Sequence, residues 1–279
     1  MKKLIILFIT CLLISCKRDD YISIPFDSKL VVEGWIEEGD VARVIVSRSI
    51  PINTVVDSSN FLNYVIRSAM VIVSDGTESD TLRLRSASPY FPPYMYIGEK
   101  IIGKRNEHYK LTVKHFGQEI TAETAIPASV PINNVKYIKG NPADTIGNLT
   151  IEFTDPADEN YYQISTFLEG FDDIFIPALY GNISDKNFIS PNIEFKIMRG
   201  VTIFPHTNIE TNYNDGDIIL VKLRTMHKEG FKFWNSWQNE ILNAQNPIFP
   251  ANSNLKGNIN GGIGIWCGYG QNTKKIVAK

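Results

Sequence analysis

The feature that most constrains the fold of this chain is a succession of short segments rich in strand-forming residues and separated by turn residues. Several of them alternate apolar and polar side chains, which is typical of strands with one buried face. Many short strands joined by regular turns favour antiparallel β-sandwiches. The segments are 30–36, 41–47, 69–73, 81–85, 109–114, 119–122, 149–153, 161–165 and 218–224.

One segment, residues 231–245, has helical periodicity instead. Its apolar residues occupy roughly half of the helical wheel, and Pro247 follows its end. We expect this helix to lie on a sheet and to bury Trp234 and Trp237, a ligand role for these rings being the alternative. The sequence therefore predicts a mainly β chain, with two antiparallel β-sandwich-like domains and one amphipathic helix near the C-terminus.

A domain boundary is expected at residues 125–131, where Pro127 and Pro131 disfavour a central strand. The length of 279 residues suits two domains of ordinary size. The prediction places an N-terminal β-sandwich at residues 29–127 and a C-terminal β-rich domain at residues 131–279. Residues 170–192 contain Gly, Pro, Asp and Asn without a period, so we expect a long loop there.

The first residues have the organisation of a secretory signal. Lys2 and Lys3 precede an apolar run, residues 4–14, which is too short to span a membrane. The following Leu-Ile-Ser-Cys resembles a bacterial lipobox, so export is expected to remove residues 1–15 and to attach lipid, including palmitate, to Cys16. An ordinary cleaved signal and a buried first element of a cytoplasmic domain are the alternatives.

Residues 16–28 then form a short tether. Asp19 and Asp20 in this tether are similar to the surface-export signal of Bacteroidetes lipoproteins. The resulting expectation is a protein of the outer membrane, lipid-anchored and displayed on the cell surface.

Charge and cysteine usage exclude other classes. The formal net charge is −2 and becomes −4 once the two lysines are removed, so no nucleic-acid partner is expected. Among the three cysteines only Cys267 would remain free in the mature protein, which leaves no intrachain disulfide. It lies in the apolar run 263–267, and we expect it to be a buried hydrophobe and not a nucleophile.

No catalytic constellation stands out. The four histidines lack the spacing of a helical metal pair, and His108 and His115 flank one predicted strand. Asp155, Asp158 and Glu159 form an acidic turn. We expect these carboxylates to be exposed to solvent, and a calcium site is the alternative. Asp172 and Asp173 are adjacent and form a poor acid–base pair. We predict no catalytic residue, no metal and no cofactor.

The best binding candidate is the segment 88–96, which contains four aromatic residues and three prolines. Prolines restrict the loop and lower the entropy lost on binding, while tyrosines offer rigid contact area. The ligand-binding candidates are Tyr90, Phe91, Tyr94 and Tyr96. The alternative is that these rings fold back and cover the edge of the sandwich.

Three ordered stretches resemble the DUF4249 family of Bacteroidetes outer-membrane lipoproteins. They are residues 30–36, residues 153–162, and residues 257–266 after the helix that contains Trp234. This resemblance implies an outer-membrane lipoprotein, often encoded beside a TonB-dependent receptor. It assigns no activity, because the family has none that can be carried over to these residues. The first half is also similar to transthyretin-like sandwiches, which makes residues 29–127 a transthyretin/Ig-like β-sandwich.

The expected function is that of a non-catalytic accessory of a TonB-dependent uptake system, which captures a ligand or docks on the receptor. The partners would be the outer membrane, the receptor and a small-molecule, glycan or peptide ligand. A surface hydrolase would instead need Asp172, Asp173, His206 and Asp217 to converge. An adhesion or envelope-structural protein would show a flat apolar patch.

Overall fold

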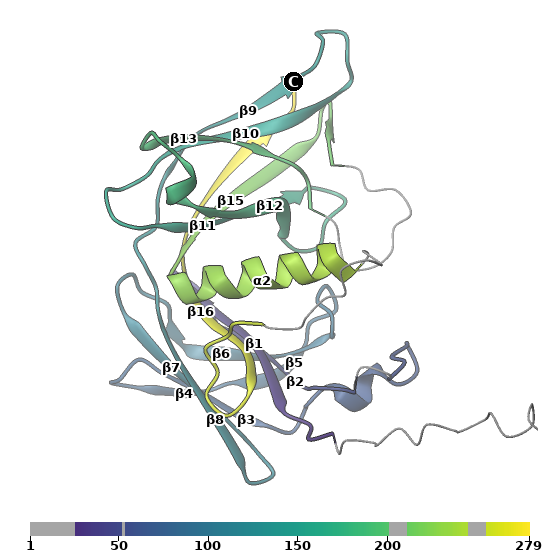
Figure 1. Cartoon of the computed structure of the whole chain (residues 1–279), viewed down its shortest axis with the longest axis vertical. Coiled ribbons are helices and arrows are strands. Elements are labelled where there is room, and N and C mark those ends of the chain that lie inside the picture. The colour runs from purple at the N-terminus through teal and green to yellow at the C-terminus, as the bar shows by residue number, and fades with distance from the viewer. Residues whose placement is uncertain (1–25, 52–53, 201–210, 245–254) are drawn as a thin grey trace, which may run out of the picture.

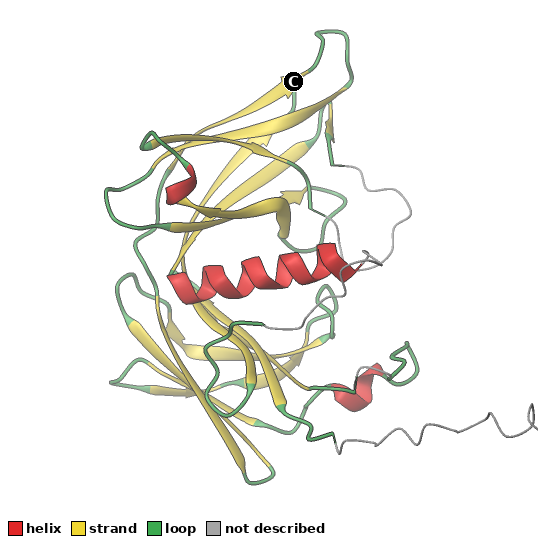
Figure 2. Ribbon diagram, in the orientation of Figure 1, coloured by secondary structure: helices red, strands yellow, loops and turns green. Residues whose placement is uncertain are grey.

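The computed structural model describes residues 26–51, 54–200, 211–244 and 255–279. Strands dominate these residues, and a single α-helix, α2 (Lys228–Ala244), lies near the C-terminus of the described chain (Figure 2). Two short 3-10 helices are present in addition, η1 (Phe61–Tyr64) and η2 (Asp185–Asn187). The predicted fold class, mainly β with one helix near the C-terminus, is confirmed, and the strands form several sheets.

The centre of the molecule is an eight-stranded sheet that runs through both halves of the chain (Figure 1). The C-terminal strand joins the halves, because it pairs in parallel with the first strand and antiparallel with β15. In spatial order the strands are β12 (Ile176–Ser184), β11 (Tyr161–Leu168), β15 (Ile218–Met226), β16 (Ile263–Val277), β1 (Leu30–Glu37), β2 (Val41–Arg48), β6 (Tyr94–Ile102) and β5 (Arg83–Ser86).

Two smaller sheets pack on this large sheet and enclose two cores. The first contains β4 (Ser79–Thr81), β3 (Met70–Ser74), β7 (His108–His115) and β8 (Gln118–Ala125). The second contains β13 (Asn192–Ile197), β10 (Ile146–Thr154), β14 (Tyr213–Asn214) and β9 (Ile132–Lys139). Trp266 belongs to the first core and Ile276 packs against the second. An even spacing separates these two residues of one strand, so both cores lie on the same face of the large sheet.

Glycines let the linker between the two cores cross β16 closely. A Cβ atom at Gly268 would lie 2.2 Å from the carbonyl oxygen of Ala125, and one at Gly270 would lie 2.4 Å from that of Pro127. The hydroxyl of Thr225 donates a hydrogen bond to the carbonyl of Ala128 at 2.8 Å. The proline-containing segment 125–131 thus passes from one core to the other where β16 has no side chains on that face.

The expectation of a long loop at residues 170–192 is wrong. The segment contains β12 and η2 and leads directly into β13. Because β12 lies at the end of the large sheet, Pro177 and Gly181 are tolerated there, as they are in edge strands generally. Its register with β11 also shifts between Gln163 and Ser165, which removes the regular alternation from the sequence pattern.

Helix α2 covers the opposite face of the large sheet. It begins three residues earlier than predicted, at Lys228, and its Phe233 joins a third apolar cluster with Cys267 and Tyr269. The indole nitrogen of Trp234 donates a hydrogen bond to the hydroxyl of Tyr269 at 2.6 Å. The expected packing of the helix on a sheet is therefore observed, and Trp234 serves that packing.

Candidate functional site

A group of charged and amide side chains lies on the helix side of the large sheet, and we call it the Glu37 cluster. Glu37 comes from β1 and accepts hydrogen bonds from Lys222, at 3.0 Å, and from Arg224, both on β15. Arg224 also donates to Gln163 at 3.1 Å. The chain of bonds continues from Gln163 to Asn182 at 3.1 Å and from Asn182 to Gln238 of α2 at 3.0 Å.

The charged side chains of this cluster are buried, so each one affects the pKa of its neighbours. The side chains of Glu37, Lys222 and Arg224 are 6%, 13% and 17% exposed. Burial raises the pKa of Glu37, but Arg224 and Lys222 outweigh it, so the net pKa lies below the ordinary value. Burial and the neighbouring Arg224 lower the pKa of Lys222, against the opposing effect of Glu37. The cluster therefore holds an ionised carboxylate between two cations and links the two halves of the chain.

The aromatic loop folds back toward this cluster. The ring of Tyr90 lies 6.0 Å from that of Trp35, which is on the same strand as Glu37. Burial raises the pKa of the Tyr90 hydroxyl, while the nearby Arg43 and Arg224 oppose the shift. Tyr90 is half-buried and still partly accessible at the margin of the Glu37 cluster.

The other predicted binding residues differ in burial: some lie at the surface and one lies in the first core. Phe91 is 49% exposed, and its ring lies 5.2 Å from that of Phe61. Tyr94 is partly buried beneath the guanidinium of Arg67, which lies 5.3 Å from its ring centre. Tyr96 is buried, accepts a hydrogen bond from the Ala69 amide and donates one to the Ile66 carbonyl. Tyr96 therefore belongs to the first core, as the fold-back alternative expected, and is corrected to a structural residue.

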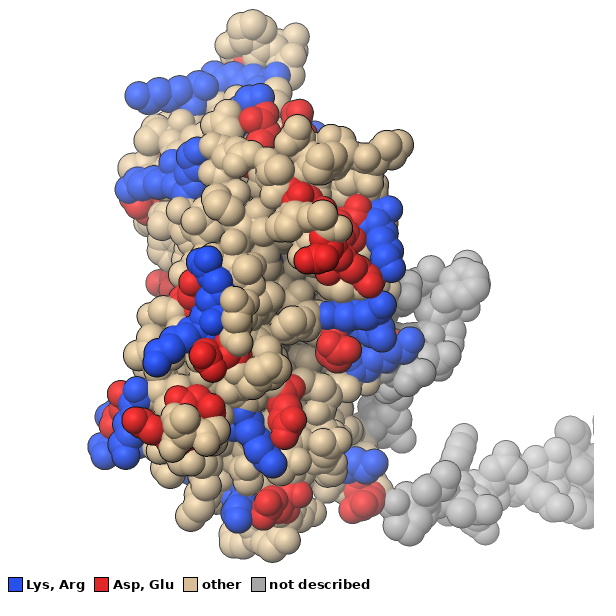
Figure 3. Space-filling view, turned by 90° about the vertical axis from the view of Figure 1, so that its left-hand side faces the viewer, with Lys and Arg blue, Asp and Glu red and all other residues tan. Residues whose placement is uncertain are grey.

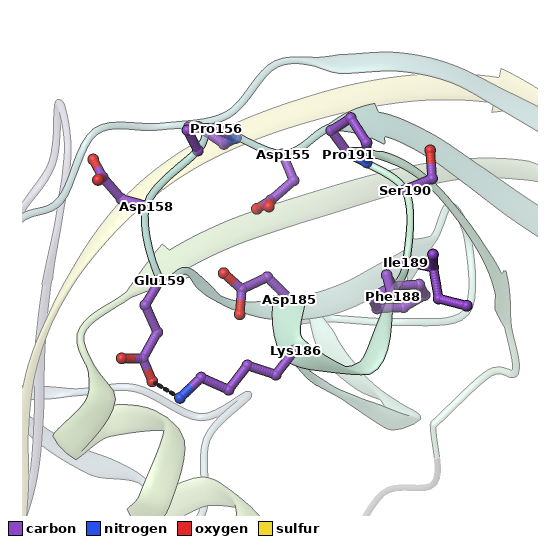
Figure 4. A pocket seen from close by; sticks show the side chains of 11 residues that line it. Asp155, Pro156, Asp158, Glu159, Asp185, Lys186, Phe188, Ile189, Ser190 and Pro191 are labelled. Atoms are coloured by element: carbon purple, nitrogen blue, oxygen red, sulfur yellow. Dashed lines mark ion pairs between the residues drawn. The ribbon is translucent and has the colours of Figure 1, made fainter.

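The acidic turn lines a hollow of about 480 Å³ (Figure 4). The carboxyls of Asp155 and Asp185 point toward one another there. Burial raises the pKa of Asp155, Asp185 raises it further, and a hydrogen bond from Tyr162 opposes the shift. Glu159 accepts from Lys186 at 2.8 Å and from Lys228, and the first of these bonds is the main reason that its pKa falls to about 2.

These carboxylates organise the turn through hydrogen bonds and ion pairs. Asp185 also accepts the Asn160 amide at 2.7 Å. In the part of the chain that the structure describes, no three His, Cys, Asp or Glu side chains are arranged to hold a metal ion. The calcium alternative gains no support from the described residues.

Two histidines that the sequence did not pair line the same hollow. His108, at the start of β7, and His227, just before α2, line one hollow of about 330 Å³ together with Glu123 and Glu229. His115 lies at the far end of β7 and is buried against Phe116. Because the two histidines are far apart along the chain, only the tertiary structure, in which α2 and β8 both contact β16, could place them around one hollow.

The acidic residues named for a hydrolase are used structurally where they are described. Asp172 is an ion-pair partner of Arg199 at 2.6 Å and accepts the Leu168 amide. Asp217 accepts the Asn214 amide at 2.7 Å in a tight turn. Asp173 is exposed, and His206 lies outside the described residues. Asp172 and Asp217 are therefore engaged in local structure in the described part of the chain.

Cys267 is expected to resist thiol reagents in the folded protein. It is buried under Gly230 of α2, where a Cβ atom would lie 2.5 Å from its Sγ, and burial raises its pKa to about 12. In a Cys11→Ser, Cys16→Ser variant, thiol titration should give no fast reaction before unfolding and one equivalent after it. A fast reaction without denaturant would contradict this burial.

The predicted signal 1–15 and the acceptor Cys16 lie outside the described residues, as does most of the tether 16–28. Within the described residues, no helix is long and apolar enough to cross a membrane. Charges of both signs are interspersed on the face shown in Figure 3, without a single basic patch.

Comparisons with known proteins identify the family of the chain. A model of the family described as "Domain of unknown function (DUF4249)" matches residues 18–275. A search of curated proteins finds no match. Among solved structures, a chain titled "Cytokine receptor complex - Crystal form 1A" is 8% identical, with 88% of this chain and 96% of that chain covered. Its TM-score of 0.27 is too low to carry an argument.

Proposed function

The chain belongs to the DUF4249 family, and from this premise we propose that it is a non-catalytic binding accessory of a TonB-dependent uptake system. In this proposal Cys16 anchors it to the outer membrane of a Bacteroidetes cell, and the folded part captures a small-molecule, glycan or peptide ligand or docks on the receptor. Surface display follows from Asp19 and Asp20 in the tether.

The observation that carries the proposal is the contrast between the Glu37 cluster and the loop beside it. Glu37 is bonded to two cations and buried, so it is unsuited to proton transfer. Tyr90 lies at the margin of that cluster, and Tyr90, Phe91 and Tyr94 all remain at least partly accessible. Aromatic rings on a proline-restricted loop suit recognition, because little conformational entropy is lost when they bind.

The anchor has its own test. Mass analysis of the N-terminal peptide should show removal of residues 1–15 and acylation of Cys16. A Cys16→Ser variant should lose both the acyl mass and retention in the outer membrane. An unmodified Cys16 in the mature protein would overturn the lipoprotein proposal.

The binding role is tested by the triple variant Tyr90→Ala, Phe91→Ala and Tyr94→Ala. Because aromatic anchors dominate binding surfaces, we expect about tenfold or greater weakening of receptor pull-down or of substrate uptake. The matched control is Phe171→Ala, which removes a highly exposed ring in the other half of the chain and should change neither. Unchanged binding of receptor and substrates in the triple variant would exclude this loop.

A further inference from the structure

We propose that a second surface, the apolar tip formed by Phe26, Val55, Val56, Phe61 and Phe91, docks into the bilayer that carries the Cys16 anchor. This inference rests on the anchored state given under the proposed function. It adds an orientation of the folded part. The tip would lie against the lipid surface, so the folded part would not move freely on its tether.

The tip is rooted beside the start of β1. The loop that carries it leaves β2 after Arg48 and returns at Val65, which bridges to Ser47. Arg48 is in register with Leu30, the first residue of β1, and the Ser49 amide donates a hydrogen bond to the Lys29 carbonyl. The N-terminal end of the described chain and η1 accordingly project from the same side of the lower half (Figure 1).

The side chains of the tip are apolar, and all are exposed except that of Phe61, which is partly buried. Val55 is 78% exposed, Val56 41% and Phe26 48%. The ring of Phe91, from the neighbouring loop, meets that of Phe61 and extends the apolar surface. The free energy falls when exposed valine and phenylalanine side chains leave water and enter the boundary between headgroups and acyl chains.

The segment between Cys16 and the tip is short, so the membrane is the partner that stays within reach of the tip. Residues 17–25 separate Cys16 from Phe26, so even a fully extended chain spans only roughly 35 Å. An anchored protein therefore keeps its tip permanently close to the membrane, at high effective concentration. A bilayer is thus a partner that the tip meets continuously, whereas a protein partner would have to diffuse to it.

The charges near the tip suit anionic headgroups. Lys29, Arg48 and Arg67 are exposed around its root. The acidic groups there are Asp27 and Asp57, and Asp57 accepts hydrogen bonds from the amide and the hydroxyl of Ser59. Basic side chains next to an apolar projection can reach lipid phosphates while the apolar groups insert.

The test uses the full-length anchored protein with a single introduced cysteine. In a Val55→Cys variant an environment-sensitive thiol probe would label only position 55, because Cys16 is acylated and Cys267 is buried. The matched control is Ile189→Cys, which lies fully exposed in the second half of the chain. Both proteins are reconstituted in vesicles that contain anionic lipid, with and without a quencher in the acyl region.

We expect the probe at position 55 to shift its emission to the blue and to be quenched from the lipid phase, with neither change at position 189. A probe at position 55 that stays water-exposed in vesicles would overturn the docking, as would a shift that appears only when receptor protein is added. Acylation of Cys16 is measured on the same samples by mass, so a failed anchor and a failed tip are told apart.

Discussion

Replacing Glu37 with glutamine is expected to lower the free energy of unfolding by about 3–5 kcal/mol, which is the usual cost of removing one partner from a buried ion pair. The change leaves Lys222 and Arg224 buried without their carboxylate. Because these cations lie on β15 and Glu37 on β1, the loss weakens the junction of the two halves. Urea denaturation at neutral pH should show a lower midpoint with an unchanged slope.

The sign of the pH dependence follows from the pKa of Glu37, which lies below its ordinary value in the folded protein. Its stabilisation is fully present above the unfolded value of about 4.3 and is lost as pH falls through the lower folded pKa. The difference between wild type and Glu37→Gln should therefore shrink below about pH 4.

Glu169→Gln is the matched control for this prediction. Glu169 also pairs with a lysine, Lys275 at 2.6 Å, but both side chains are well exposed. Removing such a surface pair should change the stability by about 1 kcal/mol or less. Equal losses in the Glu37 and Glu169 variants would contradict the burial argument.

Replacing Trp266 with alanine is expected to cost about 3–5 kcal/mol, as large-to-small changes of buried aromatic residues do. Trp266 is fully buried in the first core, and its indole nitrogen donates a hydrogen bond to the Tyr109 carbonyl at 3.1 Å. Since β16 belongs to both halves, both should unfold together in this variant. Thermal unfolding followed by calorimetry and by fluorescence should give one coincident transition.

Trp266→Phe provides the control, because it keeps an aromatic ring in the first core and removes the hydrogen bond. We expect a smaller loss than for alanine. Two separate transitions, with the first half melting alone, would show that β16 does not couple the halves.

Local pattern was enough to predict most strands and the helix. Segments such as 41–47 alternate because one face of β2 meets the first core, and that information lies within a few residues. The pattern failed at residues 170–192 because β12 is an edge strand with a shifted register, where Pro177 and Gly181 are tolerated.

The candidate site was only half predictable. The aromatic segment 88–96 stands out in the sequence because its rings and prolines are adjacent. Nothing local marks Glu37 as a partner of Lys222 and Arg224, since the ion pairs cross from the first strand to β15. The same holds for Tyr96, which local composition grouped with the binding residues and which the packing of the first core buries.

The strand-rich character and the amphipathic helix could be read from the chain alone, because periodicity acts within a few residues. The return of β16 to pair with β1 depends on the tertiary structure, and with it the large sheet, the Glu37 cluster and the exposed tip beside the N-terminal end. Pairing of distant strands depends on packing between segments far apart in the chain, and no local pattern encodes that choice.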